Sequence, residues 1–91
     1  METTNKIAVV TGGASGLGRA TVDELIKNGI KVAILDVNEE AGADAVNTLG
    51  ADNALFVQTD VTSDSSVEAA FQQIMTKFSR VDICINCAGI A

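Results

Sequence analysis

The chain has 91 residues, 47% of them hydrophobic, and a net charge of −6 from six basic and 12 acidic side chains. This length provides one small hydrophobic core, so we expect residues 1–91 to belong to a single domain. The acidic balance, without a basic stripe, argues against nucleic acid and membrane surfaces as partners. Residues 1–5 lack the pattern of a signal peptide or an Arg-rich presequence, so we expect a cytoplasmic protein and disfavour the mitochondrial matrix.

Apolar runs alternate with helical periodicity along the chain and predict four strands and three helices. The strands are expected at Ile7–Val10, at Lys31–Leu35, directly before Asp60, and at Val81–Asn86. The helices are expected at about Leu17–Asn28, at Glu39–Leu49 with Asn38 as N-cap, and behind Ser63 and Asp64. This alternation predicts an α/β fold with a parallel sheet and right-handed crossovers.

Each predicted helix has an apolar face that we expect in the core. The first helix presents Val22, Leu25 and Ile26, and the second presents Ala41, Ala45 and Val46. The third has the clearest stripe, made of Val67, Ala70, Phe71, Ile74, Met75 and Phe78.

A glycine-rich turn follows the first predicted strand directly, with the spacing Gly-x-x-x-Gly-x-Gly from Gly12 through Gly16 to Gly18. Gly12 is expected to adopt a positive φ in a tight turn, and Gly16 and Gly18 to permit close approach of phosphate and strand. The first N–H groups of the following helix lack partners within the helix and carry the positive end of its dipole. The turn therefore predicts a pyrophosphate-binding site.

A carboxylate, Asp36, stands at the end of the second predicted strand, 18 residues after Gly18. In that place it can accept hydrogen bonds from the 2′- and 3′-hydroxyls of an adenosine ribose, and it repels a 2′-phosphate. This predicts NAD rather than NADP as the cofactor, with Val37, the next residue, included in the site. The alternative is a solvated carboxylate that merely ends a strand.

Two further segments complete a family resemblance. Asp60-Val61 follows the third strand, and Asn86-Cys87-Ala88-Gly89 follows the fourth. Together with Thr11, the glycine turn and Asp36, these segments resemble, in order, the N-terminal half of a short-chain dehydrogenase/reductase, over nearly the whole chain. Within that family they look most like the type 2 3-hydroxyacyl-CoA dehydrogenases, also called 17β-hydroxysteroid dehydrogenase type 10. Cys87 departs from the usual pattern, because most members have a second Asn there.

The resemblance implies a Rossmann-type sheet with strand order 3-2-1-4 and three crossover helices, two on one face and the third on the other. Ser15 and Leu17 would line the pyrophosphate turn. Asp60 would accept from the adenine amino group, and Val61 would add a backbone contact. Alternatively, Asp60 only caps a turn before Thr62.

The resemblance also implies a role for the segment after the fourth strand. Residues 86–89 would lie under the ribose on the nicotinamide side, with Cys87, Ala88 and Gly89 presenting backbone and small side chains beside Asn86. The alternative for Ala88 and Gly89 is an ordinary strand exit.

The sequence contains no tyrosine and no histidine. Members of the family use a Tyr-x-x-x-Lys pair as general acid/base, with a Ser that polarises the substrate oxygen. The resemblance places these residues after Ala91, so we expect residues 1–91 to be the NAD-binding segment of a longer oxidoreductase acting on a secondary alcohol or ketone, plausibly a 3-hydroxyacyl-CoA or a hydroxysteroid. Two alternatives are a nucleotide-binding module without chemistry and a structural fragment that needs a partner.

Two cysteines, Cys84 and Cys87, form a C-x-x-C sequence on the fourth strand. Strand residues three apart point to opposite faces with Cα atoms about 10 Å apart, too far for a disulfide. A structural zinc site needs four ligands, and the sequence has no second Cys pair, so no metal is expected. We expect Cys84 to be a buried apolar residue and Cys87 a small residue under the cofactor.

The fourth strand is expected to form an unpaired edge that carries Val81, Ile83 and Ile85. Bare apolar edges pair readily with other chains. We therefore expect a homo-oligomer or association with a complementing C-terminal half.

Overall fold

The computed structural model describes residues 6–87 and contains four strands and three helices in strict alternation. The strands are β1 (Ile7–Thr11), β2 (Lys31–Asp36), β3 (Ala54–Gln58) and β4 (Ile83–Asn86). The helices are α1 (Gly16–Lys27), α2 (Glu39–Leu49) and α3 (Asp64–Phe78). Asn38 caps α2 as predicted, because its side chain accepts a hydrogen bond from the amide of Ala41 at 3.0 Å.

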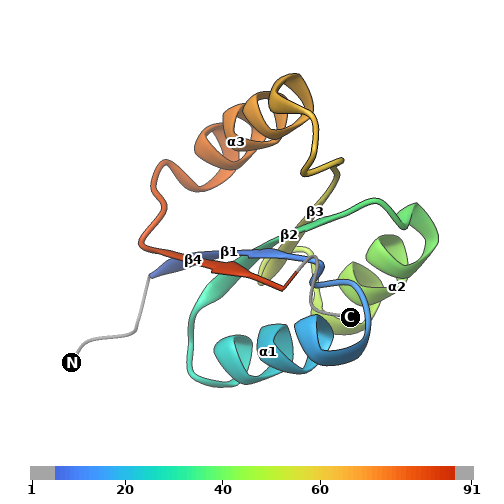
Figure 1. Cartoon of the computed structure of the whole chain (residues 1–91). Coiled ribbons are helices and arrows are strands. Elements are labelled where there is room, and N and C mark those ends of the chain that lie inside the picture. Colours follow the sequence, from blue (N-terminus) through green and yellow to red (C-terminus); the bar gives the residue numbers. More distant parts are fainter. Residues whose placement is uncertain (1–5, 88–91) are drawn as a thin grey trace.

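All four strands run parallel in one sheet of order β3-β2-β1-β4. The chain moves outward from β1 to β3 and then returns to the other side of β1, so the order reverses at that strand (Figure 1). In open sheets of this kind, ligands bind beyond the carboxyl ends of the strands at the reversal. The predicted Rossmann-type α/β fold is confirmed.

Helices α1 and α2 cover one face of the sheet (Figure 1). The buried cluster between them and the strands contains Ala8, Val10, Ala14, Val22, Ile30, Val32, Ile34, Ala45 and Ala54. Helix α2 approaches β3 closely, since a Cβ added to Gly42 would lie 2.2 Å from the ring of Phe56. This face is therefore densely packed.

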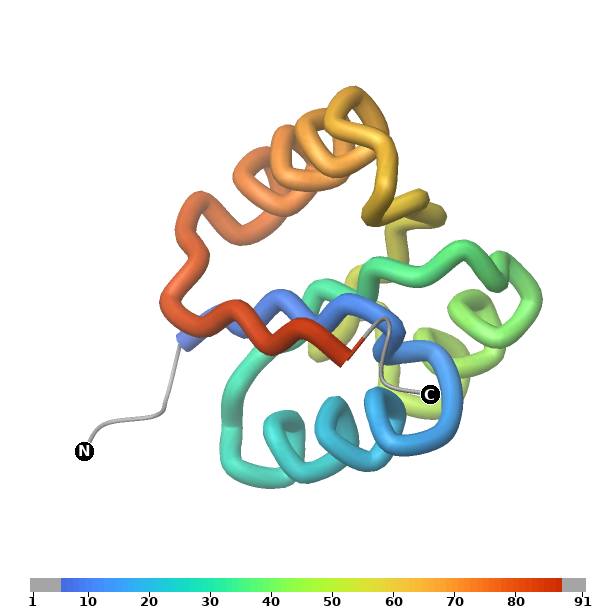
Figure 2. Tube along the Cα trace, in the orientation of Figure 1, coloured from blue at the N-terminus to red at the C-terminus, as the bar shows by residue number. Residues whose placement is uncertain are grey.

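Helix α3 is the one helix of residues 6–87 that lies on the opposite face, and it joins the two edge strands, β3 and β4 (Figure 2). It packs Ala70 and Ile74 on Val9, Ala33, Leu35 and Val57. The prediction that its whole apolar stripe is buried was wrong for Met75, which is 48% exposed. Met75 is rotated by about 100° around the helix from Ile74, so it turns away from the sheet.

Strand β4 is shorter than predicted and pairs only with β1 among the described residues. Val81 precedes the strand and packs with the α3 cluster, whereas Ile83 and Ile85 pack against the cluster under α1 and α2. The prediction that Cys84 is buried was wrong, because this side chain is exposed. In the register of the sheet, Cys84 pairs with Val9, which is fully buried under α3. Cys84 therefore faces the α3 side as well, but it lies on the edge strand, where α3 does not cover it.

Of the helices within residues 6–87, none combines the length and the apolar character needed to cross a membrane.

Candidate nucleotide-binding site

The glycine turn between β1 and α1 has the geometry that the spacing predicts. Gly12 has a φ of +68°, and its N–H donates to the carbonyl of Leu35 at 2.7 Å. A Cβ added to Gly18 would lie only 1.9 Å from the carbonyl oxygen of Gly12, so the helix start and the turn approach too closely for any side chain. At Gly16 the φ of +59° disfavours other residues, and a Cβ there would meet no protein atom within 4 Å. The close approach of a phosphate to Gly16 stays a prediction.

The N-terminus of α1 leaves its first amides available. Arg19 is the first residue of α1 whose amide makes the i to i−4 hydrogen bond of a helix, to the carbonyl of Ser15 at 3.2 Å. Ser15 is the N-cap but makes no capping bond with its side chain, and the first turn carries no acidic residue. Gly16, Leu17 and Gly18 therefore present N–H groups at the positive end of the helix, as an anion such as a pyrophosphate requires.

The carboxylate of Asp36 connects the glycine turn to the loop after β2. One oxygen, Oδ2, accepts from the amide of Ala14 at 3.1 Å, and the other, Oδ1, accepts from the amide of Asn38 at 3.1 Å. Asp36 is half-buried. It is thus a fixed group beside the turn rather than a freely solvated one, which is the placement that its predicted role on a ribose needs.

Asp60 lies exposed after β3 and caps its own turn. Its Oδ1 accepts from the hydroxyl of Thr62 at 2.6 Å and from the amide of Thr62 at 2.9 Å. These bonds, that from the hydroxyl first, lower the pKa of Asp60 below its ordinary value. The capping role is therefore present, and the adenine contact stays a prediction.

Exposed apolar side chains gather at the same end of the sheet. Among the described residues, only four large hydrophobic side chains are strongly exposed, and three of them are Leu17 at 66%, Val37 at 62% and Val61 at 42%. They follow β1, β2 and β3 respectively, at the carboxyl ends of these strands. Their position fits contact with an apolar or flat ligand surface such as a nucleotide base.

The end of β4 is tied to the end of β1. Thr11 donates its hydroxyl to Oδ1 of Asn86 at 2.6 Å, and the amide of Cys87 donates to the carbonyl of Thr11 at 3.0 Å. Cys87 is half-buried against the α1 and α2 cluster. Two other predicted site residues, Ala88 and Gly89, lie outside the described residues.

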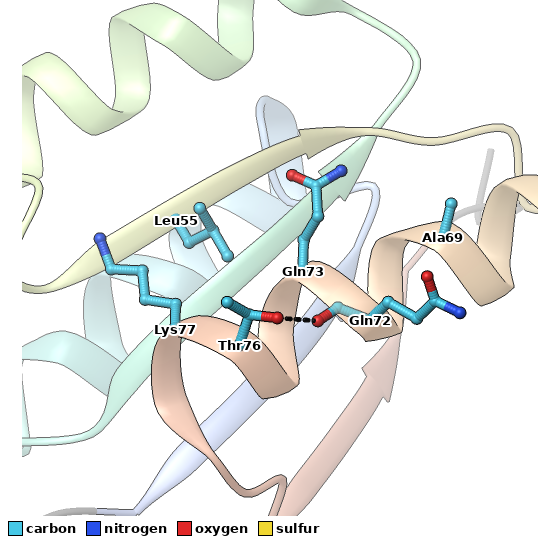
Figure 3. A pocket seen from close by; sticks show the side chains of 6 residues that line it. All are labelled: Leu55, Ala69, Gln72, Gln73, Thr76 and Lys77. Atoms are coloured by element: carbon cyan, nitrogen blue, oxygen red, sulfur yellow. Dashed lines mark hydrogen bonds between the residues drawn. The ribbon is translucent and has the colours of Figure 1, made fainter.

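Within residues 6–87, no three His, Cys, Asp or Glu side chains are grouped so that they could hold a metal ion. A separate open groove of about 450 Å³ lies between β3 and α3 (Figure 3). It is lined by Leu55, Ala69, Gln72, Gln73, Thr76 and Lys77, none of which belongs to the predicted site.

The fold and the glycine turn define a Rossmann-type nucleotide-binding segment. A model of the short chain dehydrogenase family matches residues 6–91, so the chain belongs to this family. The 3-hydroxyacyl-CoA dehydrogenase type-2 of Drosophila melanogaster is 47% identical over 87 residues, which are 96% of this chain and 34% of that protein. The human protein of the same name is 45% identical over 85 residues, covering 93% of this chain and 32% of its own length.

Solved structures give the same family. The chain superposes on a short chain dehydrogenase from Bacillus anthracis with a TM-score of 0.90 and 31% identity, covering 96% of this chain and 36% of the other. A 3-ketoacyl-(acyl-carrier-protein) reductase from Brucella melitensis, complexed with NADH, has a TM-score of 0.87 and 32% identity, with coverages of 91% and 34%. The chain thus spans about a third of the length of these relatives.

Proposed function

We propose that the chain is the NAD(H)-binding segment of an oxidoreductase that acts on a secondary alcohol or ketone of the 3-hydroxyacyl-CoA or hydroxysteroid class. The observation that carries this proposal is the juxtaposition of the open amides of α1 with the Asp36 carboxylate, held by the amide of Ala14. The names of the relatives and the NADH complex of the Brucella melitensis reductase support it.

The residues present offer the hydrogen-bond donors and the acceptor that a dinucleotide needs. The amides from Gly16 to Gly18 would bind the pyrophosphate, and Asp36 would accept from the adenosine ribose. Val37 and Val61 would contact the adenine, and the end of β4 would lie on the nicotinamide side. When bound, the cofactor supplies hydride transfer at its nicotinamide ring.

The preference for NAD over NADP is the sharpest test of the site. The fixed negative charge of Asp36 would repel a 2′-phosphate, so we expect NAD to bind at least about tenfold more tightly than NADP. Titration calorimetry on the chain should show this ratio, and Asp36→Ala should reduce it. Asp44→Ala, which removes an exposed carboxylate on α2, is the matched control and should leave the ratio unchanged. Equal affinities for both cofactors in the wild-type chain would refute the proposed preference.

The chemical step is proposed for a longer protein and not for these residues alone. Residues 1–91 contain no tyrosine and no histidine that would move the proton of an alcohol. We therefore expect the purified chain to produce no NADH from 3-hydroxyacyl-CoA above the control without protein.

A structural role through association is the second candidate, favoured by the unpaired edge of β4 within the described residues. Two copies would pair their β4 strands antiparallel about a two-fold axis, which extends the sheet symmetrically.

A further inference from the structure

Gln58, the last residue of β3, makes a contact that its place in the sheet does not require. Its side-chain Nε2 donates to the carbonyl of Val37 at 3.1 Å. In the β2–β3 register Gln58 lies opposite Asp36, and the amide of Thr59 donates to the carbonyl of Asp36 at 2.9 Å. The regular ladder ends at this point, and the Gln58 side chain adds one more hydrogen bond beyond it.

That bond fixes one particular peptide plane. The carbonyl of Val37 accepts from Gln58, and the N–H of Asn38 on the other side of the same peptide donates to Oδ1 of Asp36 at 3.1 Å. Because a peptide unit is planar, holding its oxygen and its nitrogen from two different strands leaves little freedom to rotate. Gln58 thereby holds the peptide that donates to one oxygen of the Asp36 carboxylate, whose other oxygen accepts from Ala14.

The same bond connects two loops of the candidate site. Val37 follows β2, and Val61 follows β3 three residues after Gln58. Both side chains are exposed. The loop of Val61 is itself held by the Asp60–Thr62 bonds. The hydrogen bond from the Gln58 side chain therefore connects the Val37 loop to β3, the strand that leads into the Val61 loop.

We propose that Gln58 is a positioning residue for the adenosine end of the dinucleotide, acting through the Val37–Asn38 peptide on the Asp36 carboxylate and on the apolar contact at Val37. The inference rests on the proposed function. It requires the amide as a hydrogen-bond donor: Met has similar length but no donor, and Glu would place a second acceptor against the carbonyl of Val37.

The expected effect is confined to ligands that contain adenosine. Since Gln58 is exposed, its single hydrogen bond contributes modestly, and Gln58→Met should raise the Kd for AMP and for NAD by about three- to tenfold. Gln58→Glu should weaken AMP binding at least as much. The Kd for nicotinamide mononucleotide should stay unchanged, because in the proposed site that half of the cofactor would lie at the end of β4 and not at β3. Gln73→Met, an equal change on the exposed surface of α3 (Figure 3), should alter none of these constants.

The experiment is titration of the chain and its variants with AMP, nicotinamide mononucleotide and NAD, followed by ¹⁵N NMR. In the free chain, Gln58→Met should shift the amide resonances of Val37 and Asn38, whereas Gln73→Met should not. An unchanged Kd for AMP in Gln58→Met, or equal weakening of AMP and nicotinamide mononucleotide, would overturn the inference while leaving the proposed function standing. A wild-type chain that binds neither NAD nor AMP would overturn the proposed function and the inference with it.

Discussion

The two faces of the sheet differ in how completely this chain covers them. On the face of α1 and α2, nine buried residues form one cluster. On the face of α3, six buried residues form a smaller cluster, and Met75 and Cys84 are exposed beside it. The glycine turn begins α1 and therefore belongs to the better-covered face. The glycine turn and the Asp36 loop, which the proposed site places on the pyrophosphate and the ribose, are thus built on the face that is better packed, whereas the Val61 loop leads into α3.

The largest effect is expected at the junction of β1 and α1. In Gly18→Ala, a Cβ 1.9 Å from the carbonyl oxygen of Gly12 forces the backbone apart, so we expect a loss of about 4 kcal/mol in the free energy of unfolding. Gly16→Ala is the matched control, because its Cβ meets no protein atom and only the positive φ is unfavourable. It should lower the free energy of unfolding by about 1–2 kcal/mol. Urea unfolding measures both, and equal losses would contradict the close packing of this junction.

Truncation of one buried isoleucine on each face compares the faces directly. Ile34 and Ile74 are both fully buried, the first against α1 and α2 and the second on α3. We expect Ile34→Ala to cost about 4 kcal/mol and Ile74→Ala about 2–3 kcal/mol, because a cavity beside an open surface relaxes more easily. Thermal or urea unfolding gives the two values, and a larger loss for Ile74→Ala would reverse our view of the α3 face.

We expect copies of the chain to associate through β4, because this strand is an edge of the sheet and the face under α3 is less covered. Sedimentation equilibrium under reducing conditions should give a mass that rises with concentration in the micromolar range. Cys84→Lys places a charge on an exposed position of the edge strand and should shift the chain toward the monomer, whereas Gln73→Lys on α3 should not. A wild-type chain that is monodisperse, monomeric and cooperatively folded would show that the α3 face needs no further cover.

The fold was predictable because each signal is local and strong. The apolar runs of β1 and β2, the cap at Asn38 and the glycine spacing each determine one element, and their alternation determines a parallel sheet. The errors at Met75 and Cys84 have different causes: Met75 turns away from the sheet on its own helix, whereas Cys84 faces the α3 side of a strand that α3 does not cover. Periodicity identifies an apolar side chain, but it does not show how far a neighbouring element extends over it.

The candidate site was predictable where it depends on glycines and on a strand-ending carboxylate. The positive φ of Gly12 and the clash at Gly18 follow from residue type and spacing. The bonds of Asp36 to the amide of Ala14 and of Gln58 to Val37 were not predicted, because they join segments 22 and 21 residues apart. Nothing in a single sequence marks a backbone amide or an exposed glutamine as a partner.

The smallest expected effect is a dependence on pH at the edge where β1 meets β4. Asp82 accepts from the Arg80 guanidinium, at 2.5 Å from Nη2, and from the amide of Ile7 at 2.9 Å. These bonds, that from Arg80 first, hold the pKa of Asp82 below its ordinary value. Because the carboxylate is favoured in the folded chain, its contribution is fully present above the pKa of the unfolded chain, about 3.9, and is lost as the pH falls through the folded pKa.

Stability should therefore fall between about pH 5 and the acid limit of folding, with Asp60 contributing in the same direction. Urea unfolding across this range should show a shallower decline in Asp82→Asn than in the wild type, since the variant has no carboxylate to protonate. Arg80→Gln removes the main donor and should flatten the decline in part. If Asp82→Asn and the wild type lose stability in parallel, the contact between Asp82 and the start of β1 does not stabilise the edge, and the β4 side is held by its ladder with β1 alone.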